Sequence, residues 1–292
     1  MSLPAVRVRV PASTANLGPG FDALGLALAL YDEIEVALAP SGLRVEVRGE
    51  GAGQVPTDEE HLVVRALRAA CAQCGYQVDG VVLRCHNHIP QSKGLGSSAA
   101  AAVAGVLAGY ALAGMEPDEA ALDLAARFDG HADNAGASLL GGLVISWKGE
   151  QSFHAVRLEP HPDLAPVLLV PEMTSSTEIT RGLLPAEVPH IDAAVTAGRA
   201  ALAVHALTAA PRLLLPATED RLHQTYRRTA YPATGRLVDT LRAAGVPAAV
   251  SGAGPTVLAL PVRGELPAVV NTAGFTRYRL DVARDGATVE WR

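Results

Sequence analysis

Two glycines and two serines stand close together in residues 94–99, which read Gly-Leu-Gly-Ser-Ser-Ala. A predicted strand precedes this segment and a predicted helix follows it. Glycine lets backbone N–H groups approach a ligand closely, and the first turn of a helix offers unpaired N–H groups at the positive end of its dipole. Together with the hydroxyls of Ser97 and Ser98, these groups suit a phosphate and an accompanying magnesium ion. A tight turn into a buried helix is the alternative that the segment alone leaves open.

Two other phosphate-binding patterns fit this segment less well. The spacing of Gly94, Gly96 and Ala99, with Glu116 about twenty residues later, is that of dinucleotide-binding folds. In those folds the first glycine follows the strand directly, near the start of a domain, whereas residues 90–93 intervene here. No Gly-Lys-Ser or Gly-Lys-Thr sequence follows a glycine at the spacing of a Walker loop. The sequence therefore disfavours a dinucleotide-dependent oxidoreductase.

Two further segments rich in small residues adjoin predicted strands. Residues 11–22 form a predicted loop at the end of the first strand, where ligands often bind, and Asn16 and Asp22 are candidate hydrogen-bonding partners. Residues 251–256 (Ser-Gly-Ala-Gly-Pro-Thr) stand between two predicted strands, and their glycines permit the backbone to close over a nucleotide. The alternatives are a turn stabilised by its own Asn and Asp side chains and a simple hairpin or bulge.

A polar cluster occupies residues 129–134 at the end of a predicted helix, in an otherwise apolar neighbourhood. Its members Asp129, His131, Asp133 and Asn134 are candidates for ligand contacts. Four polar side chains within six residues favour a functional cluster over plain surface. Helix capping by Asp133 or Asn134 is the alternative.

Three cysteines raise the question of a zinc site. Cys71 and Cys74 stand on a predicted helix, while Cys85, His86 and His88 stand on a predicted strand whose residues alternate between two faces. Free cysteines are usually buried apolar residues, and this interpretation is favoured over zinc. An odd number of cysteines also disfavours a disulfide framework.

The elements that hold these residues follow from hydrophobic periodicity. Strands are predicted at residues 6–10, 34–38, 43–48, 78–89, 143–147, 165–170, 246–250, 256–260 and 275–282. Helices are predicted at residues 58–74, 97–115, 117–128, 191–210, 233–244 and 265–273. A capping box of Thr57 and Glu60 opens the first helix. The irregular mixing of strands and helices favours an α+β fold, with a domain boundary near residues 150–160.

Length and composition limit the function classes. The chain has 292 residues, of which 49% are hydrophobic and 18% charged, and a formal net charge of −6. This length suffices for a large core, and two packed domains are the expectation. The acidic balance disfavours a nucleic-acid partner, because no basic field attracts phosphate backbones. The oligomeric state stays open, with a homodimer among the alternatives.

Residues 94–115 carry no charge and are long enough to cross a bilayer. They consist mainly of Ala, Gly and Ser, which favour membrane insertion only weakly, so a buried helix is favoured over a membrane span. No apolar stretch follows a basic region at the start of the chain, so no signal peptide is expected. These observations predict a cytoplasmic protein without a membrane partner.

Taken together, three segments resemble motifs of the GHMP small-molecule kinases, which include galactokinase and the homoserine, mevalonate and phosphomevalonate kinases. Residues 11–22 resemble the family's first motif, residues 90–100 its phosphate loop and residues 251–256 its glycine-rich third motif. The resemblance spans nearly the whole chain. The combination of three motifs in this order is far more specific than a single glycine loop.

Within the family, the chain is most similar to the homoserine kinase branch. Residues 12–22 and 131–134 match that branch closely, and residues 177–181 and 221–227 resemble its substrate-side motifs. The resemblance implies transfer of the ATP γ-phosphate to the side-chain hydroxyl of the small molecule L-homoserine, a step toward threonine. The alternatives are a kinase for another small alcohol, mevalonate- or shikimate-like, and a ligand sensor with the kinase fold but no turnover.

The resemblance also implies a two-domain α+β fold. Residues 1–155 then form a ribosomal-protein-like N-terminal domain that binds ATP, and residues 156–292 form a ferredoxin-like C-terminal domain, with the active site between them. The implied nucleotide contacts are Pro90, Gln91, Ser92, Lys93, Gly94, Leu95, Gly96, Ser97, Ser98, Ala99, Ala100, Gly252 and Gly254.

The remaining implied roles concern the metal and the chemistry. Ser98 and Asp129 would hold magnesium; the branch usually has Glu where this chain has Asp129, which is one methylene shorter but still a hard oxygen ligand. Asp133 and Asn134 would orient the reactants, and Thr177 would bond the γ-phosphate. Other branches of the family use an Asp in the segment of Asp133 and Asn134 as a general base. In the homoserine kinase branch the alternative is that the γ-phosphate itself takes the hydroxyl proton.

The implied substrate contacts have both signs of charge, because an amino acid is a zwitterion. They are Asn16, Asp22, His131, Arg181 and Arg227. The two arginines would grip the carboxylate, where a bidentate guanidinium adds geometry as well as energy.

Overall fold

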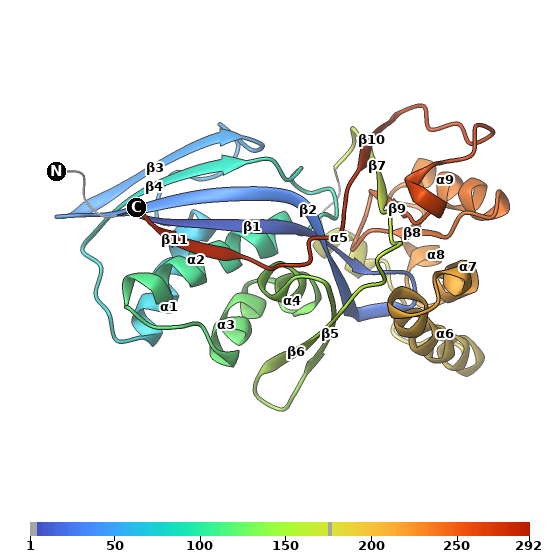
Figure 1. Ribbon diagram of the computed structural model, residues 1–292, viewed down its shortest axis with the longest axis horizontal. Coiled ribbons are helices and arrows are strands. Elements are labelled where there is room, and N and C mark those ends of the chain that lie inside the picture. Colours follow the sequence, from blue (N-terminus) through green and yellow to red (C-terminus); the bar gives the residue numbers. More distant parts are fainter. Residues whose placement is uncertain (1–4, 175–176) are drawn as a thin grey trace.

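The computed structural model describes residues 5–174 and 177–292 and contains two β-sheets with helices packed against them (Figure 1). This architecture confirms the expected α+β class. The strands are β1 (Ala5–Asn16), β2 (Gly20–Ala39), β3 (Gly42–Gly49), β4 (Gly80–Asn87), β5 (Leu143–Lys148), β6 (Phe153–Leu158), β7 (Val167–Pro171), β8 (Ala248–Val250), β9 (Val257–Ala259), β10 (Phe275–Arg279) and β11 (Thr288–Trp291). The helices are α1 (Leu62–Gln73), α2 (Ser97–Leu112), α3 (Glu119–Asp129), α4 (Asp133–Leu140), α5 (Thr177–Gly182), α6 (His190–Thr208), α7 (Leu214–Ala217), α8 (Gln224–Arg227) and α9 (Pro232–Ala243), with short 3₁₀ turns at Pro211–Leu213 and Val262–Gly264.

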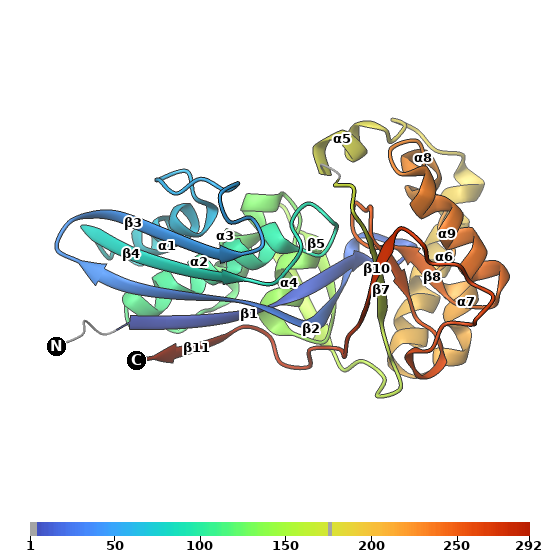
Figure 2. The same cartoon turned by 90° about the horizontal axis from the view of Figure 1, so that it is seen from above.

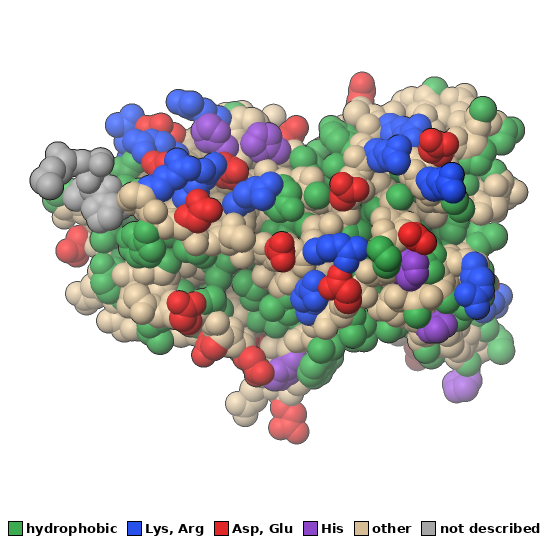
Figure 3. All heavy atoms as spheres, viewed as in Figure 1, with side chains coloured by type: hydrophobic (Ala, Val, Ile, Leu, Met, Phe, Trp, Pro, Cys, Tyr) green, Lys and Arg blue, Asp and Glu red, His purple; other side chains and the backbone are tan. Residues whose placement is uncertain are grey.

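The larger sheet has seven strands, in the order β11, β1, β2, β4, β3, with β5 and β6 continuing from β2. Helices α1 to α4 cover one face of it (Figure 1). Alternation of valine and arginine in residues 6–10 places three valines in the core beneath the helices. The arginines point to the opposite face, where charged side chains gather and pair across strands (Figure 3), as Arg7 does with Glu33 and Arg84 with Glu35.

The uncharged helix α2 lies in the core of the larger domain and packs closely on α1. A Cβ at Gly105 would lie 2.4 Å from the carbonyl oxygen of Val63, and one at Gly109 would lie 2.6 Å from the Cβ of Ala70. Glycine therefore lets the two helices approach, and this packing fixes the N-terminus of α2. Among the residues that the structure describes, no helix is long and apolar enough to cross a membrane.

The smaller sheet has four strands, in the order β10, β7, β9, β8. The continuous apolar run predicted at residues 165–170 becomes β7, which is buried throughout. α9 packs against β8 and β9, and Figure 2 shows α6 to α9 on one side of this sheet. The core between the sheet and α9 is built on Leu169, Leu237 and Leu241.

Two strands of the larger sheet include residues beyond the predicted division between residues 1–155 and 156–292, which itself stays a prediction. β6 belongs to the larger sheet and continues to Leu158. β11, at the end of the chain, returns to the larger sheet and pairs with β1, with Val6 opposite Trp291. The chain therefore enters the second domain once and leaves it again before its last strand.

Several elements differ from the sequence prediction. The first helix begins at Leu62 and not at the capping box, because Asp58 instead forms a local turn with the N–H of Glu60. Residues 265–273 are not helical, and Val269 is 79% exposed there, so a helix would bury little. The short elements β6, α4, α5 and β11 have no counterpart in the prediction.

The cysteines lie in the larger domain. Cys71 and Cys85 are buried and Cys74 is half-buried. Burial raises the pKa of the Cys71 thiol to about 11 and that of the Cys85 thiol to about 12, so both are neutral thiols at physiological pH.

Candidate active site

A cavity of about 390 Å³ opens where the two domains meet. It brings together most of the residues predicted for a nucleotide and a substrate. These lining residues are Asn16, Asp22, Ser92, Gly94, Leu95, Gly96, Ser97, Ser98, Asp129, His131, Asp133, Asn134, Arg181, Arg227 and Gly252. Ala15, Glu178 and Ala253, which belong to the motif segments but were given no role of their own, also line it, as does Phe128.

Three segments that are distant in the sequence meet at one end of the cavity. Gly96 caps the N-terminus of α2 with a φ of 68°, and a Cβ there would lie 2.0 Å from the Oγ of Ser13 on β1. Gly94 has a φ of 78°, and its Cβ would lie 2.3 Å from the carbonyl oxygen of Ser251. The predicted phosphate loop is thus clamped between β1 and the predicted third segment. The N-terminus of α2 forms the wall of the cavity at this end, as an anion site requires.

Ser98 and Asp129 form a pair of oxygen atoms beside this loop. The hydroxyl of Ser98 donates to the Oδ1 of Asp129 at 2.7 Å, and burial raises the pKa of Asp129 above its ordinary value. Both are hard oxygen ligands of the kind that magnesium prefers, so the pair fits the predicted ion. No group of three or more His, Cys, Asp or Glu side chains in the described part of the chain forms a metal site by itself, so nucleotide phosphate and water would have to complete the coordination.

Asp133 lies at the start of α4 and is buried against the cavity. Its Oδ1 accepts the backbone N–H of Asn134 at 2.7 Å. Burial raises the pKa of Asp133 to about 6, and the nearby His131 opposes this shift. The Oδ1 of Asn134 accepts from the hydroxyl of Ser13 at 3.0 Å, which holds this amide against β1. α4 therefore begins with a carboxyl and an amide, both in fixed orientations.

Asn16 and Asp22 flank a tight turn, and not the long loop predicted at residues 11–22, because β1 runs to Asn16 and β2 begins at Gly20. Asn16 donates from Nδ2 to the carbonyl of Gly252 at 2.8 Å and accepts the N–H of Asp22 on Oδ1 at 3.0 Å. The carboxylate of Asp22 accepts two hydrogen bonds from Arg181, at 2.7 and 2.9 Å. This bidentate pair links β2 to α5 beside the cavity.

Arg227 is only 1% exposed, although it lines the cavity. Its Nε donates to the carbonyl of Thr180 at 3.3 Å, and its Nη1 donates to the Nδ1 of His223 at 3.2 Å. Within the described residues it forms no ion pair with a carboxylate, and burial lowers its pKa from the ordinary value. A buried guanidinium with neutral partners favours an anionic ligand in the cavity, because an uncompensated buried charge is costly.

Lys93 does not line the cavity. Its ammonium donates to the carbonyl oxygens of Pro171 at 2.8 Å and Met173 at 2.7 Å, and also to that of Glu172. The predicted contact of Lys93 with phosphate therefore has no support from its position. Instead, this side chain links the phosphate loop to the segment that follows β7, and its burial lowers its pKa.

The other predicted residues lie around the cavity. Pro90, Ala99 and Gly254 are buried and do not line it, while Gln91 and Ala100 line a neighbouring cavity. Thr177 is the first residue of α5, and its side chain lies outside the described part of the chain.

That neighbouring cavity has a volume of about 240 Å³ and shares Ser92, Ser97 and Ser98 with the first. Its remaining lining is largely apolar and includes Ile34, Val55, Leu62, Val63, Ala101 and Ala104. His61 also lines it, and the buried Nδ1 of His61 has no hydrogen-bond partner among the described residues. Sequence reasoning missed this cavity, because an apolar pocket assembled from four segments leaves no short motif.

Comparison with known proteins agrees with this geometry. The model of the GHMP kinase N-terminal domain matches residues 61–142, and the model of the GHMP kinase C-terminal region matches residues 199–272. The chain is 52% identical over 291 residues to a homoserine kinase of Streptomyces coelicolor, covering 98% of this chain and 94% of that protein. It is 50% identical to a homoserine kinase of Mycolicibacterium smegmatis, covering 97% of this chain and 93% of that protein.

Solved structures give the same result. The crystal structure of a homoserine kinase from Cytophaga hutchinsonii has a TM-score of 0.86 and 26% identity, covering 98% of this chain and 97% of that one. A putative homoserine kinase from Listeria monocytogenes has a TM-score of 0.76 and 29% identity, covering 98% and 99%. The two matched family models cover just over half of the chain, in the order expected from its motifs. The chain therefore belongs to the GHMP kinases, a family of ATP-dependent small-molecule kinases.

Proposed function

We propose that this kinase transfers the γ-phosphoryl group of ATP to the side-chain hydroxyl of L-homoserine, giving O-phospho-L-homoserine and ADP. One observation carries the choice of acceptor. A single cavity is lined by the predicted phosphate loop and by a charged group of side chains, the carboxylate of Asp22 and the guanidinium groups of Arg181 and Arg227. Those charges match a small zwitterion, and the curated relatives named above are homoserine kinases.

The nucleotide occupies the loop and the neighbouring cavity. The N-terminus of α2 and the backbone of residues 94–98 bind the triphosphate. The base lies in the apolar cavity lined by Val55 and Leu62, which joins the phosphate loop at Ser97 and Ser98, and the unpartnered Nδ1 of His61 offers it a hydrogen bond. Ser98 and Asp129 would hold magnesium, which neutralises charge on the phosphates when it is bound.

The acceptor lies at the charged end of the cavity. Its carboxylate supplies the anion that the buried Arg227 lacks, and its ammonium binds the carboxylate of Asp22. In the structure, Asp22 and Arg181 form an ion pair with each other. A zwitterion offers each of them a replacement partner, so the pair opens toward the ligand without leaving either charge alone.

The reaction depends on placement and charge neutralisation. The acceptor hydroxyl oxygen attacks the γ-phosphorus, the bond from that phosphorus to the β-γ bridging oxygen breaks, and ADP leaves. The hydroxyl proton passes to an oxygen of the transferred phosphoryl group. Asp133 and Asn134 orient the hydroxyl, Thr177 bonds the γ-phosphate and His131 contacts the acceptor. Homodimer formation and a cytoplasmic location stay predictions from the sequence.

The test is ADP release from ATP by the purified protein, with and without magnesium. L-homoserine, L-threonine, L-serine, mevalonate and shikimate are offered in parallel. Stimulation by L-homoserine alone, and only with magnesium, is the expected result. Stimulation by another alcohol would support kinase activity but contradict the assignment of L-homoserine as the acceptor. ATP binding without turnover on any of the five would favour a ligand sensor.

A further inference from the structure

His223 is a fully buried histidine beside the acceptor end of the cavity, and it lies outside every predicted role. Its Nε2 lies 2.8 Å from the carbonyl oxygen of Gly18, in the turn between β1 and β2. Its Nδ1 lies 3.2 Å from the Nη1 of Arg227. The ring therefore bridges the turn that precedes Asp22 and the arginine assigned to the carboxylate of the acceptor.

The partners of the ring determine its protonation. A carbonyl oxygen only accepts hydrogen bonds, so Nε2 carries the hydrogen that bonds Gly18; a guanidinium only donates, so Nδ1 is bare and accepts from Arg227. Burial lowers the pKa of His223, the charge of Arg227 acts in the same direction, and the carboxylate of Asp220 opposes both. That carboxylate lies 3.6 Å from Nε2, but its oxygens accept the N–H groups of residues 222–224. The ring is accordingly neutral, with one defined tautomer.

Phe21 extends this bridge on the other side. Its ring stacks on His223 with a centroid distance of 5.0 Å and an interplanar angle of 26°. The guanidinium carbons of Arg181 and Arg227 lie 5.4 and 5.3 Å from the centre of the same ring. Phe21 directly precedes Asp22 in the chain. The ring of Phe21 therefore links the two guanidinium groups to the backbone that carries Asp22.

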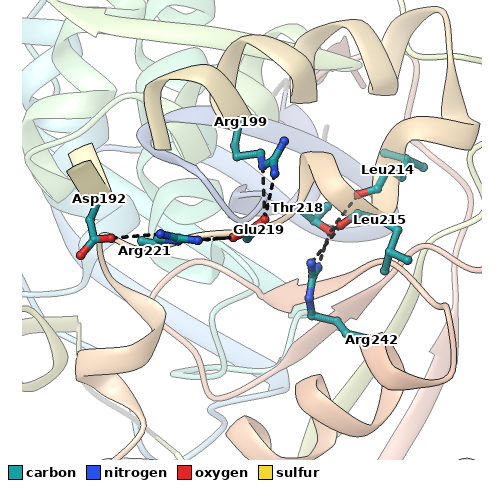
Figure 4. A network of polar contacts seen from close by, with 8 residues as sticks. All are labelled: Asp192, Arg199, Leu214, Leu215, Thr218, Glu219, Arg221 and Arg242. Atoms are coloured by element: carbon teal, nitrogen blue, oxygen red, sulfur yellow. Dashed lines mark hydrogen bonds and ion pairs between the residues drawn. The ribbon is translucent and has the colours of Figure 1, made fainter. Parts of the chain in front are cut away.

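The segment that carries His223 is itself held in place (Figure 4). Arg199 on α6 and Arg221 both pair with Glu219, and Arg221 also contacts Asp192. Arg242 on α9 donates to the hydroxyl of Thr218 at 2.8 Å. A Cβ at Gly18 would lie 2.6 Å from the carbonyl oxygen of Thr218, so the same segment presses on the β1–β2 turn. Residues 218–223 are therefore held in place by contacts with α6, α9 and that turn.

We propose that His223 is a positioning residue for acceptor recognition. As a hydrogen-bond acceptor at Nδ1, it fixes the position of the Arg227 guanidinium relative to the Asp22 carboxylate. The carboxylate and the ammonium of an α-amino acid are then bound by two groups with a set separation. This inference rests on the proposed function, because it needs Arg227 to bind the carboxylate of the acceptor. The consequence is discrimination between an amino acid and an alcohol that lacks the carboxylate.

A matched pair of substitutions separates the two ring nitrogens. His223→Asn places an amide oxygen near the position of Nδ1 and keeps an acceptor for Arg227, whereas His223→Gln places an amide nitrogen near the position of Nε2 and keeps only the bond to Gly18. Both lose the ring stacked on Phe21. His205→Gln, at an exposed histidine on α6, is the control for histidine removal.

In H223Q, KM for L-homoserine rises by about tenfold or more, as expected when a hydrogen bond to a charged group is lost. In the same variant, kcat and the KM for ATP stay within about threefold of the wild type. In H223N and H205Q, the KM for L-homoserine, the KM for ATP and kcat all stay close to the wild type. The ratio of kcat/KM for L-homoserine over its carboxamide falls by about tenfold in H223Q only. Thermal unfolding of each variant reports the common cost of losing the ring.

Equal KM values in H223Q and H223N, or an unchanged preference over the carboxamide in H223Q, would overturn the inference and leave His223 a packing residue. Calorimetric titration of L-homoserine into each protein separates this outcome from failure of the proposed function. Binding that weakens only in H223Q, without turnover in the wild type, keeps the inference and rejects the reaction. Neither binding nor turnover in the wild type rejects both.

Discussion

At the scale of single residues, the site keeps charges in places where the protein does not fully compensate them. Arg227 is buried among neutral partners, and Asp133 is buried with a pKa raised to about 6. Both arrangements cost folding free energy, because a charged group loses its hydration there. The same groups line the cavity, where a bound ligand would supply the missing polar or charged partner. Ligand binding and stability are therefore opposed at these positions.

The carboxyl of Asp133 makes this opposition measurable. The folded chain binds a proton at Asp133 more readily than the unfolded chain does, from an ordinary value of 3.8 to about 6. The contribution of Asp133 to stability is therefore present at low pH and is lost as pH rises through this window. Asp133→Asn keeps the acceptor for the N–H of Asn134 and removes the buried charge. We expect it to raise the free energy of unfolding at pH 7.5 by about 3 kcal/mol, with little gain at pH 4.

Denaturant unfolding at the two pH values checks this expectation, and the kcat of the same variant checks the role of Asp133. If the residue only orients the hydroxyl, as we propose, most of the turnover is kept. A loss of several orders of magnitude in kcat, with the fold intact, would assign the proton transfer to Asp133 instead.

At the scale of elements, the position of one helix N-terminus decides where the proposed phosphate site lies. α2 is fixed by glycines that let it pack on α1, and its first turn is fixed by the contact of Gly96 with Ser13. Loop and helix are thus held from both ends, so the N–H groups need no reorganisation when phosphate arrives.

Gly96→Ala and Gly114→Ala form a matched pair for this point. Both glycines have a φ of 68°, but a Cβ at Gly96 would lie 2.0 Å from the Oγ of Ser13, whereas a Cβ at Gly114 has nothing within 4 Å. We expect G114A to cost about 1 kcal/mol through backbone strain alone, with an unchanged KM for ATP. G96A costs more than about 3 kcal/mol, since a clash adds to the strain, and it raises KM for ATP at least about tenfold. Similar effects of both variants in unfolding and ATP kinetics would mean that the close approach at Gly96 is unimportant.

At the scale of the whole molecule, the two domains are interlocked around the cavity. The β1–β2 turn of the first domain reaches Gly252 and the carbonyl of Thr218 in the second. β11 returns from the second domain to the edge of the first sheet. Lys93 joins the phosphate loop to the end of β7. The surfaces proposed for nucleotide and acceptor are therefore joined by direct contacts between the two domains.

The only other lysine in the chain, Lys148, provides a control for this connection. Because the ammonium of Lys93 contacts backbone carbonyls that precede α5, Lys93→Met should loosen the helix that carries Arg181. We expect KM for L-homoserine to rise by about tenfold, as for other lost bonds of a charged donor, with a much smaller change in KM for ATP. Lys148→Met, at an exposed position, should change neither. A rise in KM for ATP alone in K93M would restore the phosphate contact indicated by the sequence.

The sequence by itself determined the elements and segments whose reasons are local. Valine alternation places β1, the uncharged stretch predicts a buried α2, and the glycines at 94 and 96 mark a close backbone approach. Three motifs in order sufficed for the family. Each of these features depends on neighbouring residues, whose conformational preferences act within a few positions.

Tertiary structure alone decided which partner each polar side chain takes. Lys93 stands in the phosphate loop, yet its ammonium reaches carbonyls nearly eighty residues away. His223 has no motif of its own and gains its role from Gly18 and Arg227. The last strand, β11, is stable only because β1 offers an edge. Hydrogen bonds and ion pairs act over a few ångströms in space, and only the packed fold determines which distant residues come that close.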